Sequence, residues 1–137
     1  MPFDANSDYP LGKKRPDLVT TPSGVPLEGV TLAAARAGSL GAGEMRATPE
    51  TLRLQAEVAR NAGRTQLAEN LERAAELASV PDDLLLEAYT ALRPGRATAV
   101  ELEEWAERLE GFEATKTAAF VREAASVYAE RGLLANG

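Results

Sequence analysis

Apolar residues recur at helical spacing along most of the chain after Thr48. Residues three and four apart share one face of a helix, so this spacing predicts amphipathic helices that each bury one side. The expected helices cover about 49–62, 64–78 and 82–92, and a last helical region runs from 98 to about 131. The alternation typical of a half-buried strand is absent from the sequence. The pattern therefore predicts an all-α protein.

Residues with special backbone preferences mark where these helices begin and end. Thr48 is a good N-cap, and Pro49 follows at the first helical position, where its missing N–H costs nothing. Gly63 suits the residue just past a helix C-terminus. Thr98 and Glu101 have the T-x-x-E spacing of a capping box, which predicts the start of the last helical region.

Gly111 interrupts that last helical region. A glycine in a helix interior is about 1 kcal/mol less favourable than alanine. However, the apolar stripe keeps its phase from Trp105 to Phe120, so we expect one long helix, with a kink allowed at Gly111, rather than two helices. Gly132 is expected to mark its end. Residues 44–137 are thus predicted to form a helical domain, a small bundle of about three to four helices with the last one long.

The first 43 residues differ from the rest. Residues 1–43 contain five prolines and six glycines, and proline fixes φ and lacks an amide donor, so long helices are not expected there. One short helix is predicted at 31–37, with Thr31 as N-cap and Gly38 after its end. For the remainder two interpretations stay open: a disordered tail, or an extended arm that becomes ordered on a partner. The apolar residues available to anchor such an arm are Tyr9, Leu11, Leu18 and Val19.

The composition predicts a thin hydrophobic core. Apolar residues make up 45% of the 137 residues, but aromatic residues only 5%, and much of the apolar share is alanine. Burial of apolar surface stabilises a fold by roughly 25 cal/mol per Å², so alanine-rich helices gain little by packing on one another. We therefore expect the chain to need the surface of a partner.

Charge and missing residue types exclude several functions. The net charge is −6, and the densest basic cluster, Lys13–Arg15, is too short to be the basic stripe of a nucleic-acid-binding protein. The chain has no histidine and no cysteine, which removes the usual zinc ligands, thiol nucleophiles and the commonest general base near neutral pH. No stretch approaches the roughly 20 apolar residues of a membrane span. We expect neither a nucleic-acid nor a membrane partner.

The paired carboxylates do not predict an active site. Asp82–Asp83 and Glu103–Glu104 are neighbours in sequence, and such neighbours point to different faces of a helix, so they cannot share a proton as a catalytic dyad does. Helical di-metal sites combine carboxylates with Glu-x-x-His motifs, which a chain without histidine lacks. We therefore expect no catalytic, cofactor-binding or metal-binding residue in this chain.

Three arginines are candidates for contacts with a partner. Arg46, Arg93 and Arg122 lie beside predicted helix ends or apolar stripes. An arginine at an interface can bind a carboxylate or a backbone carbonyl with two hydrogen bonds; the alternative is an ordinary solvated charge. From the residues alone two functions stay open: a structural subunit of a larger enzyme, or a free-standing helical interaction module.

Six segments carry a resemblance that decides between these two functions. Their order and spacing, from about Tyr9 to Arg131, resemble the small subunit of adenosylcobalamin-dependent diol and glycerol dehydratases. The segments are YPL at 9–11, MRATPETLRLQA at 45–56, RAAEL at 73–77, VPDD at 80–83, ALRP at 91–94 and AFVREAA at 119–125.

The resemblance implies a role inside a larger complex. The family's enzymes contain large, medium and small subunits, assembled as a dimer of heterotrimers. The large subunit is a TIM barrel that holds the substrate, and adenosylcobalamin lies between the large and medium subunits. The complex converts glycerol or propane-1,2-diol to the aldehyde by radical chemistry that the cofactor supplies. The resemblance further implies a helical, non-catalytic subunit that packs on the large subunit, with Tyr9, Arg46, Arg93 and Arg122 as structural or contact residues.

Two features depart from the family pattern. Gly95 stands where a bulky aromatic residue usually follows the Arg-Pro pair, so we expect different local packing there. The sequence also begins only a few residues before Tyr9, without the alanine- and serine-rich leader that is associated with microcompartment packaging in the diol enzymes. In this respect it resembles the glycerol branch more. We expect a cytoplasmic protein and leave its packaging in a bacterial microcompartment open.

Overall fold

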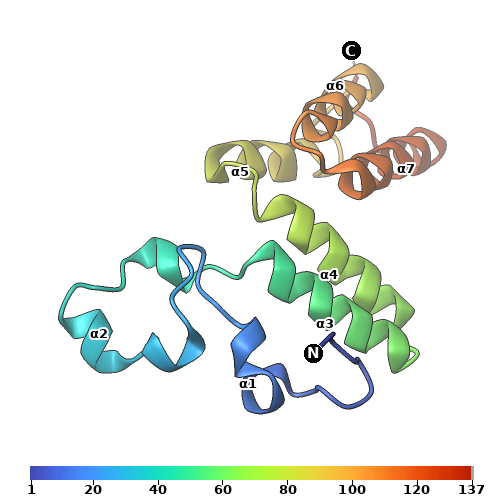
Figure 1. Cartoon of the computed structure of the whole chain (residues 1–137). Helices are drawn as coiled ribbons and strands as arrows, with labels where there is room; N and C mark the ends of the chain where they lie inside the picture. Colours follow the sequence, from blue (N-terminus) through green and yellow to red (C-terminus); the bar gives the residue numbers. More distant parts are fainter. Residues whose placement is uncertain (137) are drawn as a thin grey trace. The chain divides into compact units, whose positions relative to one another are not determined.

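The computed structural model describes residues 1–136, and these residues confirm the all-α prediction (Figure 1). Within this part of the chain the only β-type pairing is a single bridge between Thr20 and Pro26. Contacts divide the chain into an N-terminal unit, Met1–Ala78, and a C-terminal unit, Ser79–Gly137, which we describe separately. The division into an arm at 1–43 and a helical domain at 44–137 stays a prediction.

The helical segments follow the predicted order. The N-terminal unit contains α1 (Leu11–Lys14), η1 (Pro16–Leu18), η2 (Leu27–Gly29), α2 (Leu32–Arg36), η3 (Ala42–Met45), α3 (Pro49–Asn61) and α4 (Thr65–Leu77); the C-terminal unit contains α5 (Asp82–Ala91), α6 (Ala99–Glu110) and α7 (Thr115–Arg131). The predicted short helix is α2, and the Thr31 hydroxyl accepts a hydrogen bond from the Ala34 amide at its start. The short α1 and the three 3₁₀ segments were not predicted.

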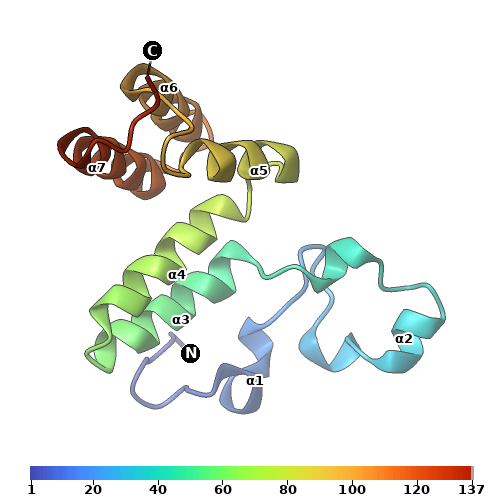
Figure 2. The same cartoon turned by 180° about the vertical axis from the view of Figure 1, so that it is seen from behind.

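The α3–α4 hairpin forms the centre of the N-terminal unit, and its two helices lie side by side in both views (Figures 1 and 2). Helix α3 begins as predicted, with Pro49 at its first position and the Thr48 hydroxyl accepting from the Thr51 amide at 3.3 Å. The buried cluster between the helices consists of alanines alone, namely Ala56, Ala59 and Ala68. Leu71 is half-buried and packs against this cluster. Small side chains let the two helices approach closely but bury little apolar area.

Polar contacts help to hold the residues before α3. The Asn61 side-chain amide donates a 2.7 Å hydrogen bond to the Asn6 side chain, which ties the chain start to the end of α3. The Ser23 hydroxyl donates to Glu44 at 2.7 Å across the 20–45 segment. Leu11 is the one predicted arm anchor that is buried, and it is buried within this unit. Tyr9, by contrast, is 57% exposed.

The α6–α7 hairpin contains the core of the C-terminal unit. Leu102 and Val121 are its largest fully buried side chains, and Leu109, Ala106 and Ala118 complete the contact between the helices. The capping box at the start of α6 is present as predicted: the Thr98 hydroxyl accepts from the Glu101 amide, and the Glu101 carboxylate accepts from the Thr98 amide at 2.8 Å. Helix α7 ends at Gly132, also as predicted.

The expectation of one continuous helix across Gly111 was wrong. Helix α6 ends at Glu110, the chain turns through 111–114, and α7 returns along α6. Glu113 adopts a left-handed conformation with φ 61°, and the Ala114 amide donates to the Leu109 carbonyl at 3.0 Å, which closes a Schellman turn. Both helices carry apolar residues at helical spacing because each packs on the other. The spacing of apolar residues alone therefore could not distinguish one long helix from a hairpin of two.

Helix α5 is attached to the hairpin through its C-terminal end. The Tyr128 hydroxyl on α7 donates a 2.6 Å hydrogen bond to the Leu92 carbonyl just past α5. The Gly95 amide donates to the Leu133 carbonyl, and the Ala135 amide donates to the Ala97 carbonyl, both at 2.8 Å. The segment between α5 and α6 is therefore fixed by the chain that follows α7.

Candidate functional site

The predicted contact residues fall in different places. Tyr9 and Arg46 belong to the N-terminal unit, where both are exposed; Arg93 and Arg122 belong to the C-terminal unit. Arg93 is exposed one residue past the α5 C-cap, and its guanidinium has no hydrogen-bond or ion-pair partner among residues 1–136. The structure therefore does not gather the four residues into one cluster within either unit.

Arg122 forms ion pairs within its own unit. Its guanidinium, on α7, forms an ion pair with Glu103 at 2.8 Å and a second ion pair with Glu110, and both carboxylates lie on α6. The hydrogen bond from Arg122 lowers the pKa of the Glu110 carboxyl below its usual value, and the two carboxylates raise the pKa of Arg122 further. Arg122 thus links the two helices of the hairpin.

Arg15 forms a second cluster that the sequence analysis did not identify. Its guanidinium pairs with Asp8 and with Asp17, each at 2.9 Å, and also donates to the backbone carbonyls of Met1 and Pro2. The side chain is only 13% exposed. Because a single arginine binds both the chain start and the segment after α1, it fixes the first 17 residues in one arrangement. The acidic residue Asp17, two positions after Arg15 in the sequence, was the signal from which this ion pair could have been predicted.

Helix α5 presents an apolar face that nothing in its own unit covers. Leu86 is 69% exposed and Tyr89 is 74% exposed. They are three residues apart and therefore lie on the same side of the helix, and Arg93 follows at the next turn of that side. Large exposed apolar side chains grouped on one face are typical of protein–protein contact surfaces.

A groove runs beside this face within the C-terminal unit. Its deeper part, about 230 Å³, lies between α5 and α6 and includes Ala91, Arg96 and Trp105 in its lining. Its shallower part, about 490 Å³, extends along α5 to Leu86 and shares Ala91 and Arg96 with the deeper part. Trp105, which belongs to the predicted apolar stripe, is half-buried and forms part of the groove wall.

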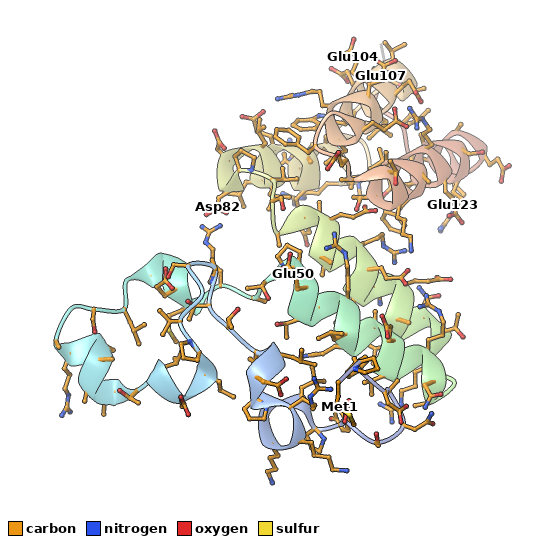
Figure 3. The ribbon with its side chains drawn as sticks, viewed as in Figure 1. Met1, Glu50, Asp82, Glu104, Glu107 and Glu123 are labelled. Carbon is orange, nitrogen blue, oxygen red and sulfur yellow. The ribbon has the colours of Figure 1, made fainter. Side chains whose placement is uncertain are left out.

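Charged side chains surround the groove. The Arg108 guanidinium lies 4.1 Å from the centre of the Trp105 ring, a cation–π contact within one helix. Three carboxylates belong to the lining: Glu87, Glu101 and Glu104. Glu104 points outward from α6 beside Glu107, as Figure 3 shows. The groove therefore combines an aromatic wall, an apolar end and a charged rim.

Metal sites and membrane spans are two further possibilities for residues 1–136. No group of three or more histidine, cysteine, aspartate and glutamate side chains in this part of the chain could hold a metal ion. None of the helices described there has both the length and the apolar character needed to cross a bilayer.

Comparisons with known proteins agree with the resemblance found in the sequence. The family model described as "Dehydratase small subunit" matches residues 5–135. This chain belongs to the dehydratase small subunit family. The propanediol dehydratase small subunits of Citrobacter freundii and Salmonella typhimurium strain LT2 are each 53% identical to it over 126 residues, which cover 91% of this chain and 73% of the relative.

Family membership indicates what kind of partner the exposed surfaces could contact. A small subunit of a multi-subunit dehydratase has larger partner subunits. The exposed face of α5 and the adjoining groove suit such a partner, because they combine apolar area with charged side chains at the edge.

Proposed function

We propose that this chain is the small, non-catalytic subunit of an adenosylcobalamin-dependent diol or glycerol dehydratase, and that it packs on and stabilises the large catalytic subunit. The observation that carries the proposal is the 53% identity to two propanediol dehydratase small subunits over 91% of the chain. The names of these relatives support propane-1,2-diol as a substrate of the complex, with glycerol as the other substrate that the resemblance allows.

The non-catalytic role is supported by the chemistry of the side chains. The sequence contains no histidine and no cysteine, so the chain lacks the residues most used as a general base or thiol nucleophile near neutral pH. Several of the carboxylates have structural contacts: Glu101 caps α6, and Glu103 and Glu110 pair with Arg122. These are contacts that hold a fold together.

The residues of this chain do not fit the cofactor. No histidine or cysteine is available to ligate cobalt. We therefore propose that adenosylcobalamin is bound by the large and medium subunits. When bound there, it supplies the radical chemistry of the dehydration.

Stabilisation of the large subunit follows from the surfaces described above. Among residues 1–136, nine of the fourteen buried hydrophobic residues are alanines, so the chain's own core contributes little apolar burial. Leu86 and Tyr89 are available to bury more against a partner. Any partner that binds only the folded state stabilises that state, and the stabilisation grows with the logarithm of the partner's concentration relative to its Kd. Binding would therefore stabilise both chains.

The remaining elements of the proposal concern the assembly. We propose a dimer of heterotrimers in the cytoplasm, with packaging in a microcompartment as an open variant. Tyr9, Arg46 and Arg93 are proposed as residues that contact another subunit. Arg122 is proposed as a structural residue, supported by its two ion pairs with α6.

Omission of this chain from a reconstituted enzyme tests the proposal. The large and medium subunits from the same source are expressed with and without this chain, and aldehyde formation from propane-1,2-diol and from glycerol is assayed with adenosylcobalamin. We expect both full activity and full assembly to require the chain. Full activity and assembly without it would instead favour a helical interaction module of some other complex.

A further inference from the structure

The α5–α6 groove is the feature that the proposed function leaves unexplained. We define it by six of its lining residues, three of them charged: Leu86, Glu87, Thr90, Arg96, Glu104 and Trp105. Its two parts adjoin through Ala91 and Arg96, so the hollow is elongated rather than round. An elongated hollow with an apolar end suits a segment of polypeptide better than a compact small molecule.

The charges of the groove indicate what kind of segment it accepts. Among the charged lining residues, Arg108 is stacked on Trp105 and Glu101 caps α6. The charges without an ion-pair partner among residues 1–136 are Glu87, Glu104 and Arg96, which leaves a net negative groove. The sequence from 79 to 137 holds six lysines and arginines against eleven aspartates and glutamates, a net charge of −5 within the total of −6. The field around the groove therefore favours a positively charged occupant.

The same charges argue against a second copy of this chain. A contact between two identical copies would place one C-terminal unit, with its net charge of −5, against a surface of a chain whose total is −6. Like charges brought together without compensation are unfavourable. The larger subunit of the dehydratase is free of this restriction, because its surface is a different sequence.

We propose that the α5–α6 groove binds a basic segment of a larger dehydratase subunit, with apolar side chains against Leu86 in the shallower part and Trp105 in the deeper part, and with lysines or arginines facing Glu87 and Glu104. This inference rests on the proposed function and adds to it the docking surface and the chemistry of the docked segment. Trp105 provides the rigid aromatic wall that is typical of the energetically important centre of an interface.

Paired charge reversals test the inference in the intact complex. The groove variant carries Glu87→Lys and Glu104→Lys. The control variant carries Glu123→Lys and Glu130→Lys, which makes the same change of net charge on exposed positions of α7 in the same unit. Each full chain is titrated into its larger subunits and the Kd is measured at low and at raised salt, after circular dichroism has confirmed equal helix content.

The inference predicts at least tenfold weaker binding of the groove variant, a change of less than twofold for the control, and a smaller salt dependence of binding for the groove variant than for the wild type. Equal binding by all three chains, or equal weakening by both variants, would overturn it and leave the proposed function standing. A wild-type chain that fails to bind the larger subunits would instead refute the proposed function itself.

A photo-reactive residue at Thr90, inside the groove, identifies the occupant directly. Irradiation of the complex is expected to cross-link Thr90→benzoyl-phenylalanine to a peptide of a larger subunit that contains lysine or arginine. A cross-link to a second copy of this chain, or to no chain at all while the complex is intact, contradicts the inference.

Discussion

The two helical hairpins of this chain make the same turn with different residues. In the α3–α4 hairpin, the Arg64 amide donates to the Ala59 carbonyl at 2.8 Å around Gly63. In the α6–α7 hairpin, the Ala114 amide makes the equivalent bond around Glu113. Both central residues are left-handed, with φ of 75° at Gly63 and 61° at Glu113. The same type of turn can therefore be predicted from the sequence of the first hairpin, where a glycine marks it, but not from that of the second, where a glutamate takes the same place.

The hairpins also differ in what they bury. The buried residues between α3 and α4 are alanines, with Leu71 half-buried beside them. The α6–α7 contact buries Leu102, Leu109 and Val121. Larger side chains bury more apolar area, so the α6–α7 hairpin should depend more on its core than the α3–α4 hairpin does.

The largest predicted effect compares the two cores. Leu102→Ala should destabilise the chain by about 2–5 kcal/mol, because it opens a cavity at a fully buried position. Leu71→Ala should have about half that effect, since Leu71 is only partly buried. Urea unfolding of the full chain measures both. The fluorescence of the single tryptophan, Trp105, reports the C-terminal unit, and circular dichroism reports all helices. Equal losses for the two variants would show that the difference in core composition has no energetic consequence.

The next effect concerns the two turns. Gly63→Ala should destabilise the chain by about 1 kcal/mol, because a Cβ atom is disfavoured at positive φ. Glu113→Gly should stabilise it by about 0.5 kcal/mol for the same reason, with part of the gain offset by the greater freedom of glycine in the unfolded chain. The midpoint of urea unfolding should therefore fall for the first variant and rise for the second. Shifts of the same sign would contradict the shared turn geometry.

The starts of the helices give a comparable, slightly smaller contrast. Thr98→Ala should destabilise α6 by about 1 kcal/mol, because the capping box loses the acceptor for the Glu101 amide. Thr98→Ser is the matched control, which keeps the hydroxyl and should stay close to the wild type. Helix α7 begins at Thr115, and its N-cap residue Ala114 makes no side-chain hydrogen bond, so that helix start has no hydroxyl to lose. Equal unfolding midpoints for Thr98→Ala and Thr98→Ser would contradict the capping role.

The smallest predicted effect is the dependence of the chain's stability on pH. The hydrogen bond from Arg15 lowers the pKa of Asp17, and that from Arg122 lowers the pKa of Glu110, below their ordinary values of 3.8 and 4.5. A carboxyl with a lowered folded-state pKa stabilises the fold above its ordinary pKa, and the contribution disappears as the pH falls through the lowered value. Stability should thus be flat above about pH 5 and fall below about pH 4. Arg15→Gln should weaken this fall more than Arg122→Gln, because the Arg15 side chain is more enclosed.

Local signals in the sequence predicted much of the fold. Thr48 with Pro49, Thr98 with Glu101, and Gly63 each acts through its own backbone or the next turn, so these residues determined helix boundaries that the structure confirms. Glu113 carries no such signal, since glutamate is not a residue expected at positive φ. The hairpin at 111–114 was missed because only the tertiary contact between α6 and α7 distinguishes it from a continuous helix.

The candidate site could be predicted only in part. Arg93 was predicted as a contact residue because it lies beside a helix end; it is exposed just past α5, and its contact with a partner stays a prediction. The groove was not predicted, because it joins Leu86 to Trp105 across a turn whose shape depends on contacts with Leu133 and Ala135 near the chain end. Arg15 was assigned to a basic cluster, and its pairing with Asp8, seven residues earlier, depends on the folding of the first residues.

The central claim, that this chain acts by assembly with larger dehydratase subunits, is tested most directly by native mass spectrometry of the co-expressed complex. The account predicts one mass that contains this chain in equal number with the large and medium subunits, and loss of that mass when the chain is omitted. A complete complex of the larger subunits that forms without this chain, while the chain itself remains free in the same sample, would contradict it.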